Sequence, residues 1–254
     1  MLILLSPAKT LDLVSPFPDE PTAPRFGTEA RRIARAAAKL GAPKLAELMH
    51  ISPALAETNA ARFKQFAKAE ERPAIRMFAG DVYRGFDAAS AEPEVIDFAQ
   101  GHVRILSGLY GLLRPRDAIR PYRLEMGTRW APPSTDHADR LVDHWDKKVA
   151  RALLADLKTE GSNLILNLAS KEYFAVVGPH LPKKVKLVTP DFRVETPKGL
   201  QFQSFTAKVA RGALARFVCD ERIADPAGLA GFDRDGWKLD PASPPQAPLF
   251  VRSA

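Results

Sequence analysis

Two short stretches of the sequence place hydroxyl and amino groups directly after apolar runs. Residues 6–10 (SPAKT) follow the run LILL, and residues 169–173 (ASKEY) follow the run NLILNL. Hydroxyl groups together with a lysine ammonium can hold an anion such as phosphate. Because α/β folds bind ligands beyond the carboxyl ends of their strands, we expect both junctions to contribute to one anion-binding cleft.

Side chains from distant segments are expected to converge on this cleft. The predicted members are one hydroxyl, three lysines and one arginine: Ser6, Lys9, Lys171, Lys208 and Arg123. Cations that lie close together repel one another, so Glu125 or Glu172 would have to offset them. The alternative interpretation of each junction is a capped turn beside a solvated lysine.

Residues 101–130 carry six arginines and only two acidic residues. Gly108, Gly111, Pro115 and Pro121 make this segment rich in turns, which would present the arginines from irregular backbone. The planar guanidinium suits phosphate or carboxylate, so the segment is a candidate phosphate-binding surface. A solvated surface is the alternative for each arginine taken alone.

Two short helices are expected to meet across His50-Ile51-Ser52, the first over 44–49 and the second from Pro53 to about Lys68. Serine before proline is a typical helix start. The pattern resembles the helix-hairpin-helix DNA-binding motif, in which amides at the second helix face a phosphate. The hairpin of that motif normally reads glycine, apolar residue, glycine, whereas here both glycine positions hold other residues. A plain helical hairpin is the alternative.

Composition narrows the class of protein. The 254 residues carry 37 Lys and Arg against 30 Asp and Glu, and the net charge of +7 favours polyanionic partners. The single cysteine, Cys219, excludes an internal disulfide framework and fits a reducing cytoplasm. No apolar run approaches the length of a membrane span, and standard catalytic signatures such as a phosphate-binding glycine loop, HExxH, CxxC and GxSxG are absent.

The pattern along the chain predicts one α+β domain with a mixed β-sheet, surrounding helices, the helix-hairpin-helix-like element and a basic cleft. Further helices are expected over 28–40, 94–106, from Thr135 or Asp136 to Leu157, over 171–177 and over 207–223. Strands are expected over 2–5, 75–78, 163–168, 186–189, 202–205 and 249–252, with a proline-rich segment from about 240.

Several motifs together resemble the peroxide stress protein YaaA family of bacteria. They are MLILLSPAKTLD, NAARF with FAGDVYRG, LSGLYGLLRPRD, PYRLEMG, NLASKEYF and AKVARG, spread in order from Met1 to about Phe232. The resemblance implies a single α+β domain with a basic cleft, a cytoplasmic role in oxidative-stress defence, limitation of free intracellular iron, and DNA binding. It supports placing the hairpin element at 45–63, and it implies no catalytic residues.

The leading prediction is a protein that binds duplex or branched DNA with little sequence preference and protects it during peroxide stress. No metal, cofactor or membrane contact is expected. Packing in the core is the favoured interpretation of Tyr83 and Tyr110, and stacking on an unpaired base is the alternative. The predicted DNA- or anion-binding residues are Ser6, Lys9, Thr10, Arg62, Lys64, Arg114, Arg116, Arg123, Lys171, Lys208 and Arg211.

Two other functions compete with DNA binding. The first is an enzyme of unassigned chemistry on a phosphorylated or nucleotide-like small molecule, with Glu125 and Glu172 as candidate general acid and base groups. The second is direct iron sequestration. The few scattered histidines argue against a dedicated iron site, and one pair, His137 and His144, has a spacing unusual for metal ligands on a helix.

Overall fold

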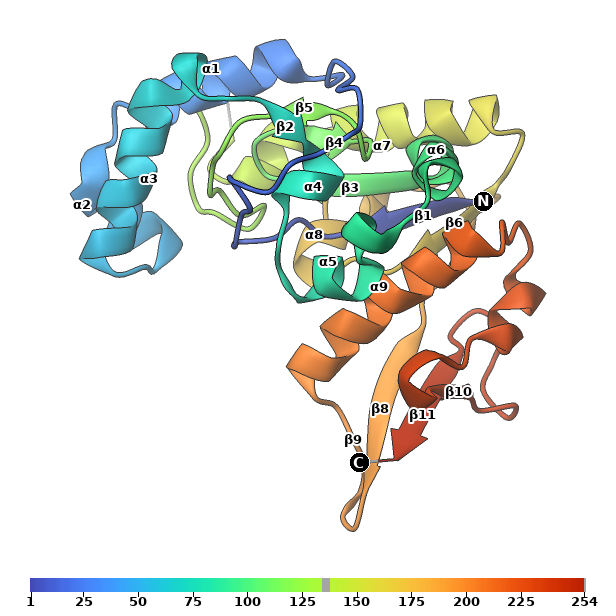
Figure 1. The fold of residues 1–254 in the computed structure, drawn as a ribbon. Helices are drawn as coiled ribbons and strands as arrows, with labels where there is room; N and C mark the ends of the chain where they lie inside the picture. Colours follow the sequence, from blue (N-terminus) through green and yellow to red (C-terminus); the bar gives the residue numbers. More distant parts are fainter. Residues whose placement is uncertain (134–137, 254) are drawn as a thin grey trace.

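A five-stranded sheet lies at the centre of the computed structural model, which describes residues 1–133 and 138–253 (Figure 1). Its order is β4 (Gly111–Leu113), β3 (Val103–Ser107), β1 (Leu2–Leu5), β6 (Leu164–Asn167) and β7 (Lys186–Val188). Four of these strands run parallel, and β4 returns antiparallel to β3. All four side chains of β1 are fully buried, which explains why that strand is continuously apolar.

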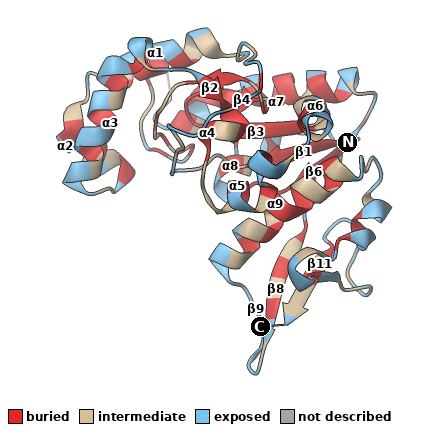
Figure 2. Cartoon of the chain, viewed as in Figure 1, coloured by how far each residue is buried: buried red, intermediate tan, exposed pale blue. Residues whose placement is uncertain are grey.

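Helices cover both sides of this sheet. In Figure 1, α7 (Leu141–Thr159) lies above it and α9 (Ser204–Asp220) below it. Figure 2 shows the strands buried and the outer surfaces of the helices exposed. The short helices between these elements are α4 (Ala74–Met77), α5 (Asp81–Phe86), α6 (Pro93–His102) and α8 (Lys171–Phe174), and a small ribbon pairs β2 (Arg72–Pro73) with β5 (Ala118–Ile119).

A second sheet is built from the last third of the chain. Its order is β10 (Lys238–Leu239), β11 (Leu249–Ser253), β8 (Asp191–Thr196) and β9 (Gly199–Gln201). The rings of Phe192 and Phe250 stack with centroids 5.4 Å apart, and Phe232 packs edge-on against Phe250. The proline-rich segment from 240 is therefore an integral part of the fold, and the predicted final strand is confirmed.

Helices α5 and α9 cross at very short distance because glycine stands on both sides of the contact. A Cβ atom at Gly212 would lie 1.7 Å from the carbonyl oxygen of Val82, and one at Gly85 would lie 1.9 Å from that of Val209. Only glycine leaves room for such an approach. This crossing holds α9, and with it Lys208, against the segment that follows α4.

Three helices form the lobe at the left of Figure 1: α1 (Gly27–Ala37), α2 (Gly41–Met49) and α3 (Pro53–Gln65). His50 has the left-handed conformation, with φ of 50°, that a glycine would adopt more easily. Ser52 caps α3, because its hydroxyl accepts a hydrogen bond from the Leu55 amide at 3.4 Å. The predicted pair of helices and the short connection between them are confirmed. That this pair acts as a DNA-binding motif stays a prediction.

Three predicted elements are wrong. Residues 74–77 form a helical turn where a strand was expected, since their backbone pairs with the loop at Pro115 and Asp117. The helix expected over 94–106 ends at His102, and Val103–Ser107 is a core strand instead, because pairing with β1 outweighs the helical spacing of its apolar residues. Residues 202–205 are the entry into α9, and the hairpin strand ends at Gln201.

The remaining predicted helices are right in type and differ at their ends. Helix α1 ends at Ala37, and the segment after β6 is helical only from Lys171 to Phe174. The predicted cap at Thr135 or Asp136 lies outside the described residues. Within the described part of the chain, no helix has the length and apolar character needed to cross a membrane.

Candidate functional site

The two hydroxyl-bearing junctions meet at the carboxyl edge of the central sheet. Ser6 follows β1, and its Oγ accepts a hydrogen bond from the Ser170 amide at 2.9 Å and donates one to Ser170 Oγ at 3.4 Å. The Tyr83 hydroxyl donates to the carbonyl of Ser6 at 3.0 Å. The parallel pairing of β1 with β6 brings these turns together, as the sequence predicts.

Lys9 and Arg123 share one carboxylate beside this junction. Lys9 Nζ lies 3.3 Å from Glu125 Oε1, and Arg123 Nε donates to the same oxygen at 3.1 Å. The Glu125 side chain is only 12% exposed, and its second oxygen is buried and accepts no hydrogen bond from the described residues. The predicted anion site therefore contains the negative charge of Glu125, which Lys9 and Arg123 already share.

A cavity of about 650 Å³ separates these residues from α2. Its charged lining is balanced, with three cations and three carboxylates: Lys9, Lys44, Arg129, Glu47, Glu125 and Glu172. The Glu172 carboxylate accepts a hydrogen bond from the Gly127 amide at 3.1 Å. The cavity thus offers paired donors and acceptors to a ligand, and not a uniformly positive surface.

The structure does not place the other residues predicted for the cleft in the lining of this cavity: Thr10, Lys171, Lys208 and Arg211. Lys208 Nζ is 3.9 Å from Asp81 Oδ2, and the neighbouring Gly80 contacts Ala8 so closely that a Cβ would lie 2.9 Å from the alanine methyl carbon. Thr10 is exposed, and its carbonyl accepts from the Ala79 amide at 3.0 Å. Lys171 is exposed and directly follows Ser170.

Arg211 lies further along α9 than Lys208. Burial lowers the pKa of its guanidinium, and the nearby Asp191 carboxylate opposes that shift.

The arginine segment is largely neutralised by carboxylates. Its ion pairs are Arg104 with Asp156 at 2.6 Å, Arg114 with Asp117 at 3.1 Å, Arg116 with Asp97 at 2.7 Å, Arg120 with Glu71 at 2.8 Å and Arg123 with Glu125 at 3.1 Å. Arg129 is exposed and has no carboxylate partner among residues 1–133 and 138–253. A phosphate that binds Arg114 or Arg116 would have to compete with an existing partner.

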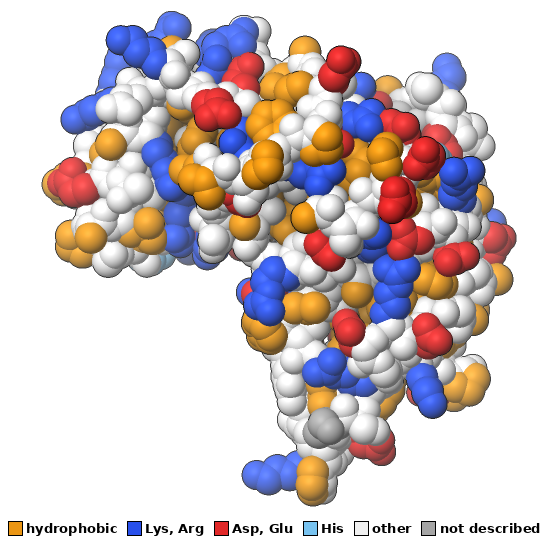
Figure 3. Space-filling view, viewed as in Figure 1, with side chains coloured by type: hydrophobic (Ala, Val, Ile, Leu, Met, Phe, Trp, Pro, Cys, Tyr) orange, Lys and Arg blue, Asp and Glu red, His pale blue; other side chains and the backbone are white. Residues whose placement is uncertain are grey.

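Exposed cations without such partners gather on the helical lobe, where Figure 3 shows Lys and Arg side chains over α1. Those without a carboxylate partner in the described residues are Arg31, Arg35, Lys39, Lys64 and Lys68, from α1, α3 and the turns that follow them. Arg62 is half-buried, and burial lowers its pKa. The basic run RRIARAAAK, residues 31–39, is a sequence signal for this surface, and none of its residues is among the predicted DNA-binding residues.

All four tyrosines of the chain are buried beneath the candidate site. Burial raises the pKa of Tyr110 to about 12 and raises that of Tyr83 well above its ordinary value. The Tyr122 hydroxyl lies 2.6 Å from the Ser107 hydroxyl, and Tyr110 accepts a hydrogen bond from the Arg120 amide at 3.0 Å. Core packing of Tyr83 and Tyr110 is therefore confirmed, and the alternative of stacking on a base is wrong, because both rings are enclosed by the core.

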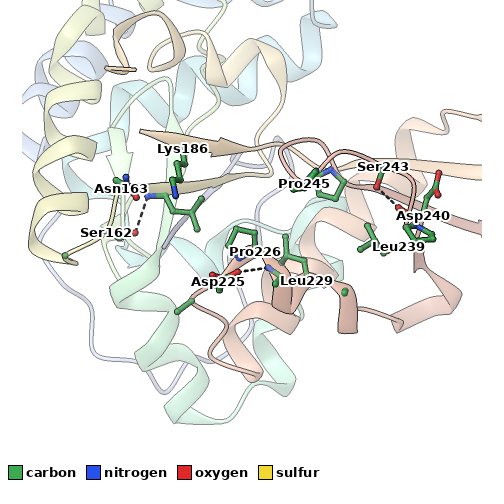
Figure 4. Close-up of a pocket in the computed structure, with 17 residues that line it drawn as sticks. Ser162, Asn163, Lys186, Asp225, Pro226, Leu229, Leu239, Asp240, Ser243 and Pro245 are labelled. Atoms are coloured by element: carbon green, nitrogen blue, oxygen red, sulfur yellow. Dashed lines mark hydrogen bonds between the residues drawn. The ribbon is translucent and has the colours of Figure 1, made fainter. Parts of the chain in front are cut away.

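A larger cavity, of about 960 Å³, lies at the opposite edge of the sheet, between the start of β6 and the C-terminal segment (Figure 4). Several of its polar side chains serve local turns. Ser162 accepts from the Leu164 amide at 3.1 Å, and Asp225 accepts from the Ala227 amide at 2.8 Å. The side-chain oxygens of Ser162 and Asp225 already accept hydrogen bonds from backbone amides, so we assign no ligand to this cavity.

Among the described residues, no group of three or more His, Cys, Asp and Glu side chains is placed to hold a metal ion. His137, one of the pair considered from the sequence, lies outside those residues. Cys219 is buried among apolar neighbours, and burial raises its pKa to about 12. It behaves as a small hydrophobic residue in the core.

Comparison with known proteins identifies relatives over almost the whole chain. Residues 1–243 match the family described as peroxide stress protein YaaA. A UPF0246 protein of Rhizorhabdus wittichii is 58% identical over 238 residues, which cover 93% of both chains. UPF0246 proteins of Jannaschia sp. and Roseobacter denitrificans are 45% and 44% identical, and the alignments cover at least 97% of each chain.

Proposed function

Because the chain belongs to the peroxide stress protein YaaA family, we propose that it is a DNA-binding protein of the peroxide response. In this proposal it acts in the cytoplasm, protects DNA and helps to limit free intracellular iron. Its partner is duplex or branched DNA, bound through phosphates with little reading of base sequence. The observation that carries the proposal is the set of unpaired cations on the helical lobe.

These cations suit phosphate binding because no carboxylate among the described residues pairs with them. Lys64 and Lys68 are exposed on α3 and the turn after it, and Arg35 and Lys39 lie on and after the adjacent α1. An exposed cation without a partner can release counterions from DNA at little cost in lost internal contacts. The ion-paired arginines of residues 104–123 are less suited, and in this proposal they mainly stabilise the fold.

Lys64→Glu with Lys68→Glu is the test. Duplex affinity of the unchanged protein should fall with salt between about 50 and 200 mM, by roughly 0.9 in log K per log salt for each phosphate neutralised. The double variant should bind more weakly and show a shallower salt dependence, measured by fluorescence anisotropy. Both residues are exposed, so the fold should be preserved.

Lys183→Glu with Lys184→Glu is the matched control, since both lysines are exposed on a different part of the surface and the charge change is the same. The proposal requires that the control pair affect binding less than the α3 pair. DNA binding that does not respond to salt, or equal losses in the two variants, would contradict it.

A second candidate function rests on Glu125. Glu125 lines a cavity whose volume lies in the range of small-molecule sites, and its second oxygen is buried without a hydrogen-bond partner among the described residues, so the carboxylate is a candidate to accept a proton or a hydrogen bond from a ligand. This favours an enzyme acting on a phosphorylated or nucleotide-like molecule. Titration calorimetry with nucleoside phosphates tests it, and the absence of any Glu125-dependent heat would reject it.

A further inference from the structure

An exposed apolar cluster stands between β9 and the first turn of α9. Across residues 1–133 and 138–253, the large hydrophobic side chains that are exposed are Leu13, Val14, Leu200, Phe202 and Phe205. Three of the five fall within six residues, and the two phenylalanines are 49% and 54% exposed. A single exposed apolar side chain is ordinary, whereas two half-exposed aromatic rings together point to a binding surface.

Arginines hold both rings in place. The Arg193 guanidinium lies 5.5 Å from the centre of the Phe202 ring, and that of Arg84 lies 5.2 Å from the centre of the Phe205 ring. The two arginines come from β8 and α5, so separate elements support the two rings. Each ring is restrained by a cation–π contact and still leaves about half of its surface open.

Cations outnumber carboxylates around the rings. Arg84 and Lys198 are exposed and have no carboxylate partner in the described residues, whereas Arg193 pairs with Asp191 at 2.7 Å. Lys208, one turn further along α9, lies 3.9 Å from Asp81, and the exposed Glu195 stands opposite Leu200 in the β8–β9 pair. Figure 3 shows orange and blue side chains next to each other near the N-terminal end of α9, below a hollow that separates them from the lobe of α1 to α3.

We propose that Phe202 and Phe205 stack on unpaired bases of DNA while Arg84 and Lys198 contact the flanking phosphates. Aromatic rings beside arginine and lysine are the usual composition of surfaces that bind single-stranded nucleic acid, because every base has a face on which a ring can stack. The surrounding cations favour this partner over an apolar face of another protein. The inference rests on the proposed DNA binding and adds that the preferred DNA contains unpaired nucleotides.

Two DNA probes separate this inference from the proposed function: a blunt duplex, and the same duplex with a single-stranded tail that carries 2-aminopurine. Phe202→Leu with Phe205→Leu keeps the apolar character of the surface and removes both rings. We expect this variant to bind the tailed probe about 5- to 150-fold more weakly for each stacked base lost. Its affinity for the blunt duplex should not change. Quenching of 2-aminopurine, seen with the unchanged protein, should disappear.

Leu13→Ala with Val14→Ala serves as the control, because both residues are exposed apolar side chains outside the cluster. It should leave binding of both probes unchanged. If the unchanged protein binds neither probe, the proposed function itself fails. If it binds both and the leucine variant loses neither tailed-probe affinity nor quenching, stacking is overturned. Stacking is also overturned if the leucine variant loses the same affinity for both probes. It is likewise overturned if that variant differs from the unchanged protein only in self-association, measured by light scattering.

Discussion

Individual residues in this protein take their roles from neighbours that are distant in sequence. Lys9 is exposed at its ammonium and still shares the Glu125 carboxylate with Arg123. Glu125 therefore connects the turn after β1 to the segment that follows β5. The SPAKT turn is built into the sheet edge through Ser6, and its lysine is partly neutralised before any ligand binds.

Cys219 provides a prediction at the scale of one residue. Burial raises its thiol pKa to about 12, so the thiol form dominates until the pH approaches that value, and at pH 8 about one thiol in 10,000 is ionised. The thiolate is the reactive form. We expect no labelling of the native protein by iodoacetamide or oxidation by dilute peroxide, and complete labelling after unfolding in guanidinium, both followed by mass spectrometry. Rapid labelling of the native protein would contradict this.

At the scale of elements, close packing of helices on the sheet decides where the cations lie. Helix α9 brings Lys208 within 3.9 Å of Asp81 because α5 and α9 approach each other at Gly85 and Gly212. A larger residue at either position would push the helices apart. The position of Lys208 beside Asp81 is thus a consequence of glycine at the helix crossing.

Gly212→Ala tests that crossing. The new methyl group would meet the Val82 carbonyl at 1.7 Å, so the helices must separate. We expect a loss of about 1–3 kcal/mol or more in the free energy of unfolding, measured by urea denaturation.

Gly101→Ala is the matched control, because a Cβ there has no neighbour within 4 Å and the residue lies in α6. The better helix propensity of alanine should leave stability unchanged or raise it by up to about 1 kcal/mol. Comparable losses in the two variants would show that the crossing at Gly212 is not tight in solution.

At the scale of the whole molecule, the two sheets share one core. The second sheet contributes Phe192 and Phe250, and α9 lies between it and the central sheet in Figure 1. Trp145 is buried against the first sheet and Trp237 against the second, so the two halves carry separate fluorescence reporters. Because their apolar residues belong to one continuous cluster, we expect both halves to unfold together.

Phe250→Ala tests the contribution of the C-terminal strand. Phe250 is fully buried, so its removal should lower the free energy of unfolding by about 3–5 kcal/mol. Tryptophan fluorescence and circular dichroism should still report one coincident transition in urea. Phe205→Ala, at an exposed ring, should cost much less. A first transition confined to Trp237 would instead show that the second sheet unfolds by itself.

Much of the fold follows from local patterns in the sequence. Continuous apolar runs predict β1 and β6 correctly, and serine before proline marks the start of α3. The strand β3 was missed because its apolar residues also fit a helical period, and only pairing with β1 distinguishes the two conformations. A short segment that can adopt either structure is decided by its neighbours in space.

The sequence by itself determined the family, the α+β class and the junctions where polar residues follow buried strands, because residue type and local spacing carry that information. Tertiary structure alone decided which charges meet. It paired most arginines of residues 101–130 with carboxylates, buried the tyrosines and left Phe202 and Phe205 exposed. These outcomes depend on strand register and on the distance at which helices cross, and neither quantity is a property of any single segment.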